Sequence, residues 1–194
     1  MADTVTKDRK TQITEAAQNM FREKGYSATS MRDLAARIGI EPASLYSHIR
    51  SKEEILHTIC FRIAEEFFKS IKDVTTSTES ADIKLEKAIV SHVEVIKNNA
   101  DAFAVFYNDW RHLSEPVLSE FISARREYEN IFRGIIQEGL EDGIFKPMDV
   151  KFTVLTLFSS LNWLYHWFKP SGKMNPKEIG GNLSNMILYG MMNK

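Results

Sequence analysis

The sequence predicts an all-α fold of about nine helices, and three observations lead to this expectation. Apolar residues recur at helical spacing over long stretches, as in Ile55, Ile59, Ile63, Phe67 and Ile71, which form one stripe. Glycine and proline are few, at 9 and 5 of 194 residues, and no run alternates apolar and polar residues as a strand does. A chain that is 43% hydrophobic and 26% charged has enough apolar material for a sizeable core.

The first expected helix covers about residues 7–24. Its apolar residues Ile13, Ala17 and Phe21 repeat every four positions and therefore lie on one face. Gly25 is expected to end this helix, because glycine adopts the backbone conformation that closes a helix with little strain.

Two short helices joined by a tight turn follow, over Ser30 to His48. Ser30 can cap the first of them, and Asp33 adds an acidic residue to its first turn. Gly39 stands where the chain must turn, and Pro42 can open the next helix because its missing N–H is no loss there. A helix, a short glycine-containing turn and a second helix form the helix-turn-helix pattern, which is typical of proteins that place the second helix in the major groove of DNA.

The rest of the chain predicts six more helices and one clear loop. A long helix is expected from Lys52 to Ile71, and the Ser- and Thr-rich segment 74–82 is expected to be a loop. Further helices are expected at about 83–98, 101–111, 115–141, 149–169 and 176–192. We therefore expect a helix-turn-helix domain over residues 1–52 and an effector-binding and dimerisation domain over residues 53–194.

Two stretches of the first quarter of the chain, AAQNMFREKGYSATSMRDLAARIGI and ASLYSHIRSKEEIL, resemble the DNA-binding domain of the tetracycline-repressor (TetR/AcrR) family. Ile49 and Arg50 stand where that family usually carries Phe and Lys, which preserves the apolar and basic character. The resemblance implies a cytoplasmic, homodimeric transcription regulator that binds a palindromic double-stranded DNA operator. It also implies that the second domain responds to a small molecule.

Ten residues in and around the helix-turn-helix are expected to contact DNA. They are Thr29, Ser30, Arg32, Pro42, Ala43, Ser44, Tyr46, Ser47, His48 and Lys52. Ala43 and Ser44 are small enough for close approach to base edges, whereas Leu45 and Ile49 should anchor the second helix to the domain.

The family resemblance implies specific roles for two of these residues. Tyr46 would contact a backbone phosphate through its hydroxyl, and Lys52 would meet phosphate beside a helix N-terminus. Other interpretations remain: Tyr46 could fill the edge of the core, His48 could be a solvated side chain, and Ser30 could act only as a helix cap.

The charge distribution gives little support to bulk electrostatic attraction for DNA. The net charge is −1, and residues 1–57 hold nine Lys or Arg against eight Asp or Glu. DNA binding must then depend on the placement of Arg32, Arg37, Arg50 and Lys52, and on a dimer that presents them twice. The single Cys60 excludes an internal disulfide, fits a reducing compartment, and lies among apolar residues as a buried thiol. No apolar run approaches the ~20 residues that span a bilayer, so no membrane partner is expected.

The second half combines many aromatic residues with a few polar ones, a mixture typical of a ligand pocket. The residues expected to bind an effector are Phe106, Tyr107, Asn108, Trp110, Arg111, Arg125, Tyr128, Asn162, Trp163, His166 and Trp167. The alternative is that most of these aromatics belong to the core and the dimer interface.

Two short pieces, YNDWR at 107–111 and NWLYHW at 162–167, resemble family members that sense acyl-CoA thioesters. That resemblance implies an apolar tunnel for the acyl chain, with arginines such as Arg111 and Arg125 near the CoA phosphates. Alternatively, Arg125 pairs with neighbouring glutamates on a solvated helix face. A hydrophobic drug and a sterol-like molecule are the other effector classes that fit.

The last two helices are expected to pair with those of a second copy in a four-helix bundle. Their apolar residues point in more than one direction, so they require burial on more than one side. The residues expected there include Phe152, Leu155, Leu161, Leu164, Phe168, Leu183, Met186, Ile187 and Met191.

No catalytic or cofactor motif emerges from the sequence. The five histidines show no metal-ligand spacing, and no phosphate-binding or dinucleotide-binding glycine motif is present. We therefore expect no enzyme activity, no cofactor and no metal. The alternative function is a helical interaction protein that uses the same scaffold and no longer binds DNA.

Overall fold

The structure is a computed structural model that describes residues 8–167 and 175–192. Over these residues the chain is helical, with one isolated bridge between Phe145 and Met192 in place of any strand. Two compact units are present, and each is described by itself. The N-terminal unit comprises Met1–Ile63 with Asp101–Ser119, and the C-terminal unit comprises Ala64–Ala100 with Glu120–Lys194. The expected all-α fold is confirmed, and the expected boundary after residue 52 stays a prediction.

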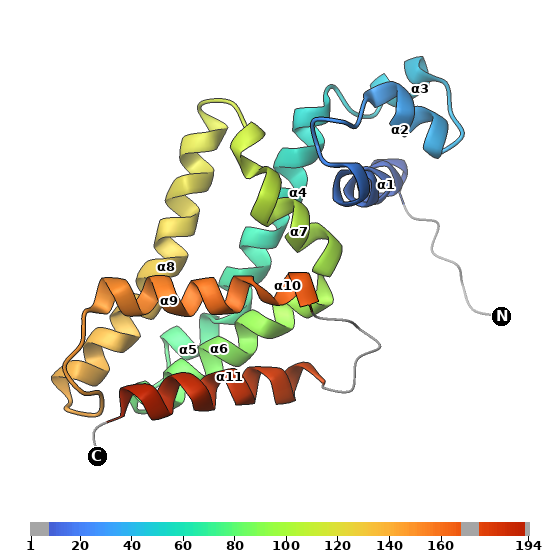
Figure 1. Cartoon of the computed structure of the whole chain (residues 1–194). Helices are drawn as coiled ribbons and strands as arrows, with labels where there is room; N and C mark the ends of the chain where they lie inside the picture. The colour runs from blue at the N-terminus through green and yellow to red at the C-terminus, as the bar shows by residue number, and fades with distance from the viewer. Residues whose placement is uncertain (1–7, 168–174, 193–194) are drawn as a thin grey trace. The chain divides into compact units, whose positions relative to one another are not determined.

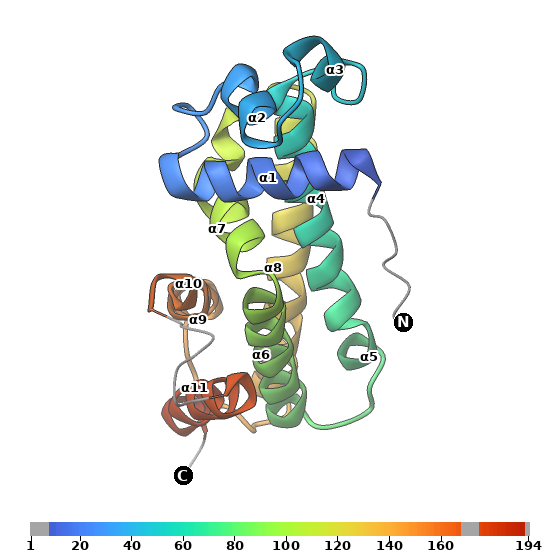
Figure 2. The same ribbon diagram turned by 90° about the vertical axis from the view of Figure 1, so that its right-hand side faces the viewer.

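The N-terminal unit begins with α1 (Arg9–Lys24), α2 (Met31–Arg37) and α3 (Pro42–Tyr46). It continues with the first part of α4 (Lys52–Ser70), and also takes in α7 (Ala100–Asp109) and the 3-10 turn η1 (Trp110–His112). Helix α2 packs on both α1 and α3, as Figure 2 shows. The core of the unit includes Ile13, Phe21, Leu34, Leu45 and Phe103, each at most 2% exposed.

The C-terminal unit contains the end of α4, then α5 (Lys72–Thr75), α6 (Ala81–Asn98) and most of α8 (Val117–Glu141). It ends with α9 (Val150–Asn162), α10 (Leu164–Trp167) and α11 (Pro176–Met191). Helices α6 and α11 lie side by side (Figures 1 and 2), and the approach is close because Gly180 of α11 faces Val90 of α6. A Cβ at Gly180 would lie 3.1 Å from the Cα of Val90.

The observed helices follow the expected ones closely, although α5 is an additional short helix and α3 ends at Tyr46 before the expected His48. The expected loop over 74–82 is shorter, because α5 reaches Thr75 and α6 already begins at Ala81. The expected helix 149–169 is interrupted at Trp163, between α9 and α10, and its last two residues lie outside the described part of the chain. The expected burial of Cys60 is confirmed.

Candidate DNA-binding surface

The cap of α2 and the turn between α2 and α3 form as the sequence predicts. Ser30 Oγ accepts the backbone N–H of Asp33 at 3.1 Å, and the Asp33 carboxylate accepts the Ser30 N–H at 3.2 Å. The Ser30 hydroxyl also donates to the Asp33 carboxylate at 2.6 Å, and this bond, together with that from the Ser30 N–H, lowers the pKa of Asp33 because both stabilise the charged carboxylate. Gly39 adopts φ 69°, the left-handed conformation that lets the chain reverse, and Pro42 occupies the first turn of α3.

Helix α3 is held by two apolar residues and exposes the rest. Leu45 and Ile49 are 0% and 1% exposed, as expected for anchors. Ala43, Ser44, Ser47 and His48 are exposed on the opposite side. Tyr46 is 53% exposed, so it does not fill the edge of the core. The surface expected to read DNA is therefore available to a partner.

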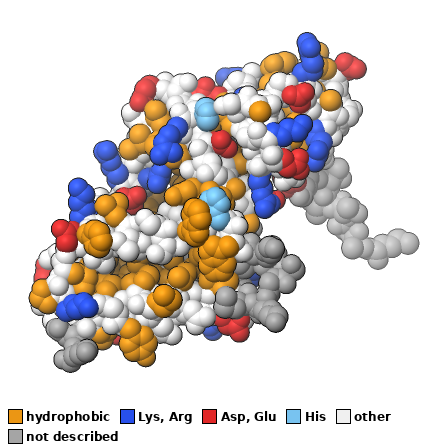
Figure 3. All heavy atoms as spheres, in the orientation of Figure 1, with side chains coloured by type: hydrophobic (Ala, Val, Ile, Leu, Met, Phe, Trp, Pro, Cys, Tyr) orange, Lys and Arg blue, Asp and Glu red, His pale blue; other side chains and the backbone are white. Residues whose placement is uncertain are grey.

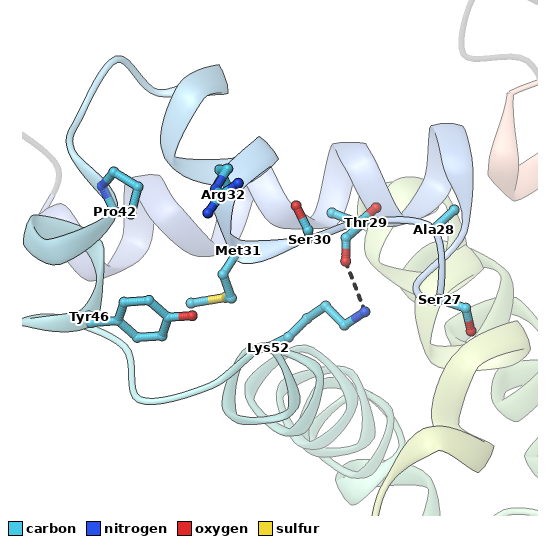
Figure 4. A pocket seen from close by; sticks show the side chains of 9 residues that line it. All are labelled: Ser27, Ala28, Thr29, Ser30, Met31, Arg32, Pro42, Tyr46 and Lys52. Atoms are coloured by element: carbon cyan, nitrogen blue, oxygen red, sulfur yellow. Dashed lines mark hydrogen bonds between the residues drawn. The ribbon is translucent and has the colours of Figure 1, made fainter.

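Most of the predicted DNA-contacting residues gather around one hollow of about 610 Å³ (Figure 4). Its lining is Ser27, Ala28, Thr29, Ser30, Met31, Arg32, Pro42, Tyr46 and Lys52. A second hollow, of about 910 Å³, also has Tyr46 in its lining, together with residues that include Ser47, His48 and Arg50. Tyr46 thus borders two concave surfaces beside α3.

Two of the predicted contacts are engaged within the protein. The Thr29 side chain is buried, and its hydroxyl donates to the carbonyl oxygen of Gly25 at 3.0 Å. The Lys52 ammonium donates to the carbonyl oxygens of Tyr26 and Thr29, each at 2.8 Å, and lies 4.2 Å from the centre of the Tyr26 ring. Figure 4 shows Lys52 reaching across to Thr29. These bonds give Lys52 a structural role in addition to the phosphate contact that the family resemblance implies.

Other basic residues of this unit are also paired. Lys10 lies 2.8 Å from the Glu54 carboxylate, and Arg37 lies 3.5 Å from that of Glu23. Arg32 remains exposed at the hollow beside α2. The expectation that DNA binding depends on a few placed groups therefore fits the geometry.

The predicted effector-binding residues fall into both units. Phe106, Tyr107, Asn108, Trp110 and Arg111 belong to the N-terminal unit, on α7 and η1. Phe106 is buried, the rings of Phe103 and Tyr107 stack at 6.0 Å, and the Arg111 guanidinium lies 4.5 Å from the centre of the Trp110 ring.

The remaining six belong to the C-terminal unit, and the structure joins two of them through a third residue. Buried His92 of α6 lies between Tyr128 of α8 and Asn162 of α9. The Oδ1 atom of Asn162 can only accept, so His92 Nε2 donates to it at 3.3 Å, and His92 Nδ1 accepts from the Tyr128 hydroxyl at 3.2 Å. The Phe67 ring stacks on the imidazole at 4.5 Å.

Burial dominates the acid–base behaviour of this cluster. Loss of solvation lowers the pKa of His92 to about 3, only partly opposed by its bond to Asn162. Burial also raises the pKa of Tyr128. The cluster is therefore neutral at physiological pH, and His92 is a single defined tautomer.

His92 was not among the predicted effector-binding residues, although the sequence carried a signal. It occupies an apolar stripe of α6 with Leu85, Ala88, Ile89 and Val93. A lone histidine at a core position needs polar partners from other elements, and these do not appear in the local sequence.

The other four predicted residues of this unit lie elsewhere. Arg125 is half-buried on α8. Trp163 and Trp167 are 58% and 44% exposed, and His166 is also exposed, so the structure does not collect them with His92. That the eleven residues form one effector site stays a prediction.

The described residues contain no group of three or more His, Cys, Asp or Glu placed to hold a metal ion. Within the same residues, no helix is both long enough and apolar enough to cross a membrane.

Comparison with known proteins identifies both halves of the chain. Residues 13–59 match the family described as "Bacterial regulatory proteins, tetR family", and residues 78–191 match "Tetracyclin repressor-like, C-terminal domain". The repressor KstR2 of Mycolicibacterium smegmatis is 26% identical over 186 residues, which cover 94% of this chain and 90% of that protein.

Two solved structures of regulatory proteins share this fold. The ketosteroid transcriptional regulator KstR2 of Mycobacterium tuberculosis superimposes with a TM-score of 0.91 at 25% identity, covering 100% of this chain and 99% of that one. AibR, solved with isovaleryl coenzyme A and operator DNA, shares the fold with a TM-score of 0.81 at 20% identity, covering 92% and 97%. The chain thus belongs to the TetR family of bacterial regulatory proteins, with a helix-turn-helix DNA-binding region at its N-terminus and a tetracycline-repressor-like domain C-terminal to it.

Proposed function

We propose that the protein is a homodimeric transcriptional repressor that binds a palindromic operator and is released by a hydrophobic small molecule. The observation that carries the proposal is the capped α2–α3 pair, which exposes Ser44, Tyr46 and His48 beside two hollows. Its relative KstR2 is named a repressor, which supports the direction of control. We expect the protein to act in the cytoplasm, where the chromosome of a bacterium lies.

DNA binding is tested by fluorescence anisotropy on DNA from upstream of the protein's own gene. Ser44→Glu places a carboxylate on the exposed side of α3, and we expect affinity to fall about tenfold or more through repulsion from phosphate. Ser123→Glu makes the same change on the exposed surface of α8 and should bind like wild type. Tyr46→Phe removes one hydroxyl and should weaken binding about fivefold.

The alternative function, a helical interaction protein without DNA binding, predicts a different result. Wild-type protein would then show no binding at low salt. Equal binding by wild type and Ser44→Glu would show that any observed affinity does not involve α3. Either result would overturn the proposed use of this surface.

We infer that two copies pair through α9 and α11. Hydrophobic side chains gather over these two helices in Figure 3, and they include several large exposed residues. Met186 and Tyr189 are 75% and 85% exposed, and Phe152 is 70% exposed. By contrast, Leu161, Leu164 and Met191 of the expected interface are buried within the chain itself, and Phe168 lies outside the described residues. Such an exposed apolar area is unusual for a monomer.

The dimer is tested by sedimentation at micromolar concentration. Met186→Glu places a charge in the proposed interface and should shift the protein toward monomer. Ile83→Glu replaces an apolar residue of α6 that is also partly exposed, and should remain dimeric. A monomeric wild type, or a dimeric Met186→Glu variant with unchanged affinity, would refute this interface.

For the effector, we propose an acyl-CoA thioester. The sequence pieces at 107–111 and 162–167 support this class, as does the isovaleryl-CoA in AibR, although that protein is only 20% identical. The description of KstR2 as a ketosteroid regulator makes a steroid-like molecule the second candidate.

Thermal shift and DNA release with isovaleryl-CoA, a long-chain acyl-CoA, free CoA and a steroid distinguish these classes. An acyl-CoA that binds the DNA-free conformer better by about 2 kcal/mol would lower DNA affinity about thirtyfold. Free CoA should stabilise the protein less than its thioesters do. A response to the steroid alone would replace the acyl-CoA proposal.

A further inference from the structure

The loop that leads into α2 is held from two sides, and one side comes from a distant segment of the chain. This loop runs from Tyr26 to Thr29 and ends at Ser30, the cap of α2. Residues 101–119 belong to the same compact unit, although the chain belongs to the C-terminal unit before and after them. Their turn η1 therefore reaches the DNA-reading region through contacts and not through sequence proximity.

Aromatic packing makes the first contact. The Tyr26 ring is buried, and the His112 ring of η1 lies 4.9 Å from it, centre to centre. Phe21 of α1 meets Tyr26 edge-on at 5.1 Å, and the Lys52 ammonium lies 4.2 Å from the centre of the Tyr26 ring. The ring is thus enclosed by residues from α1, α4 and η1.

Hydrogen bonds make the second contact. His112 Nδ1 lies 3.0 Å from the carbonyl oxygen of Asp109, and because a carbonyl only accepts, Nδ1 carries the proton. His112 Nε2 is then free to accept from the Ser27 hydroxyl, which lies 3.0 Å away. The Asp109 carboxylate in turn accepts the backbone N–H of Tyr26. Two side chains of the 109–112 turn therefore bind two consecutive residues of the loop.

The opposite side of the loop is fixed by α4. Lys52 donates to the carbonyl oxygens of Tyr26 and Thr29, so both backbone polar groups of Tyr26 are bonded, the N–H to Asp109 and the carbonyl to Lys52. The Glu53 carboxylate, next to Lys52, accepts the backbone N–H of Ser114 beyond η1. A loop bonded at successive positions has little freedom to change the direction in which α2 starts.

We propose that Asp109 and His112 are positioning residues for DNA reading, which clamp the Tyr26–Ser27 backbone and thereby set the orientation of α2 and α3. The inference rests on the proposed DNA-binding function. It assigns to the 109–112 turn a role in operator affinity that involves no contact with DNA.

The test uses full-length protein and four substitutions at three positions of one segment. Asp109→Ala and His112→Ala remove the two clamps, and we expect each to reduce operator affinity about tenfold. Asp109→Asn keeps an oxygen that can accept the Tyr26 N–H, and should restore most of the affinity. Ser114→Ala is the matched control, because only the backbone N–H of that exposed residue takes part in the contact with Glu53.

Two further measurements separate positioning from direct contact. The slope of log affinity against log salt should stay as in wild type, whereas loss of a phosphate contact would reduce its magnitude by about 1. Hydrogen exchange should become faster over residues 26–30 in both alanine variants. His112 is exposed, so His112→Ala leaves the core intact and decides the question if Asp109→Ala does not fold.

Unchanged affinity in His112→Ala, or a reduced salt slope in either variant, would overturn the clamp. If the wild-type protein binds no DNA, the proposed function fails, but exchange over residues 26–30 still tests the clamp on its own. Unchanged exchange in both alanine variants would then refute it.

Discussion

The pH dependence of His92 should destabilise the folded protein at pH values well above those at which carboxylates titrate. The imidazole is 2% exposed, lies against Phe67, and uses both nitrogens in bonds to Tyr128 and Asn162. A second ring proton would remove the acceptor for the Tyr128 hydroxyl and place a charge in an apolar environment. The neutral ring is therefore the form that folding selects.

The magnitude follows from the two pKa values. An unfolded chain has a histidine pKa of about 6.5, and burial lowers that of folded His92 to about 3. Between these values the unfolded state binds a proton that the folded state does not, so stability falls as the pH falls. The loss is up to about 1.4 kcal/mol per pH unit, or about 2 kcal/mol between pH 8 and pH 5. Above pH 6.5 the contribution is fully present.

Urea denaturation at pH 8, 6.5, 5.5 and 5.0, at one fixed protein concentration, measures this effect. The comparison protein is His92→Gln, whose amide cannot titrate. Other groups with shifted pKa values, such as Asp109, titrate in both proteins, so their effects cancel in the difference. We expect wild type to be the more stable protein at pH 8 and to lose most of that advantage by pH 5.

Parallel stability curves for the two proteins over this range would contradict the prediction. Such a result would mean that His92 has the same pKa in the folded and unfolded states, as a solvated imidazole does. If the folded pKa of His92 lay between 5 and 6.5, the stability difference between the two proteins would stop changing once the pH fell below that value.

Four other substitutions test helix packing, helix capping and the bonds made by Lys52. Gly139→Ala should destabilise the protein by about 1–3 kcal/mol in thermal denaturation, because a Cβ at that position would lie 2.3 Å from the Phe145 ring. Gly134→Ala is the control on the same helix. Its Cβ would meet nothing within 4 Å, so the substitution should stabilise the protein by up to about 1 kcal/mol. A destabilised Gly134→Ala would show that the helix is not free to accept a side chain at that position. Ser30→Ala removes the cap of α2 and should cost about 1 kcal/mol, which denaturation midpoints will detect. Lys52→Met should lower thermal stability as well as DNA affinity, because the Lys52 ammonium donates to two backbone carbonyls. If the substitution lowered DNA affinity but left thermal stability unchanged, the only role of Lys52 would be to contact a DNA phosphate.

Local features of the fold could be predicted from the sequence because their causes are local. Ser30 caps α2 through a residue three positions away, and Gly39 turns the chain through its own φ. Likewise, Leu45 and Ile49 are buried as their i, i+4 spacing indicates. These interactions depend on neighbours that the sequence shows directly, so the helix-turn-helix could be located to within a residue or two.

Long-range partners could not be predicted in the same way. The sequence marks Lys52 as basic but does not show that carbonyls 23 and 26 residues earlier accept its protons. It shows His112 next to Trp110 and Arg111, whereas the structure places it against Ser27, 85 residues earlier in the chain. Similarly, aromatic content did not distinguish buried Phe106 from exposed Trp163, because each ring is equally suited to a core or to an interface.

The ion pairs and hydrogen bonds that basic residues make within the protein limit the number of cations that are free to bind DNA phosphates. Lys10 and Arg37 are paired with carboxylates, and Lys52 is bonded to the loop before α2. Arg32 and Arg50 are exposed beside the reading helices, which gives about four such cations in a dimer. Each neutralised phosphate contributes about −0.9 to the slope of log affinity against log salt, so we expect a slope near −4. A slope near −8 would mean that Lys10 and Arg37 leave their carboxylates on binding, and that DNA competes with the ion pairs of the free protein.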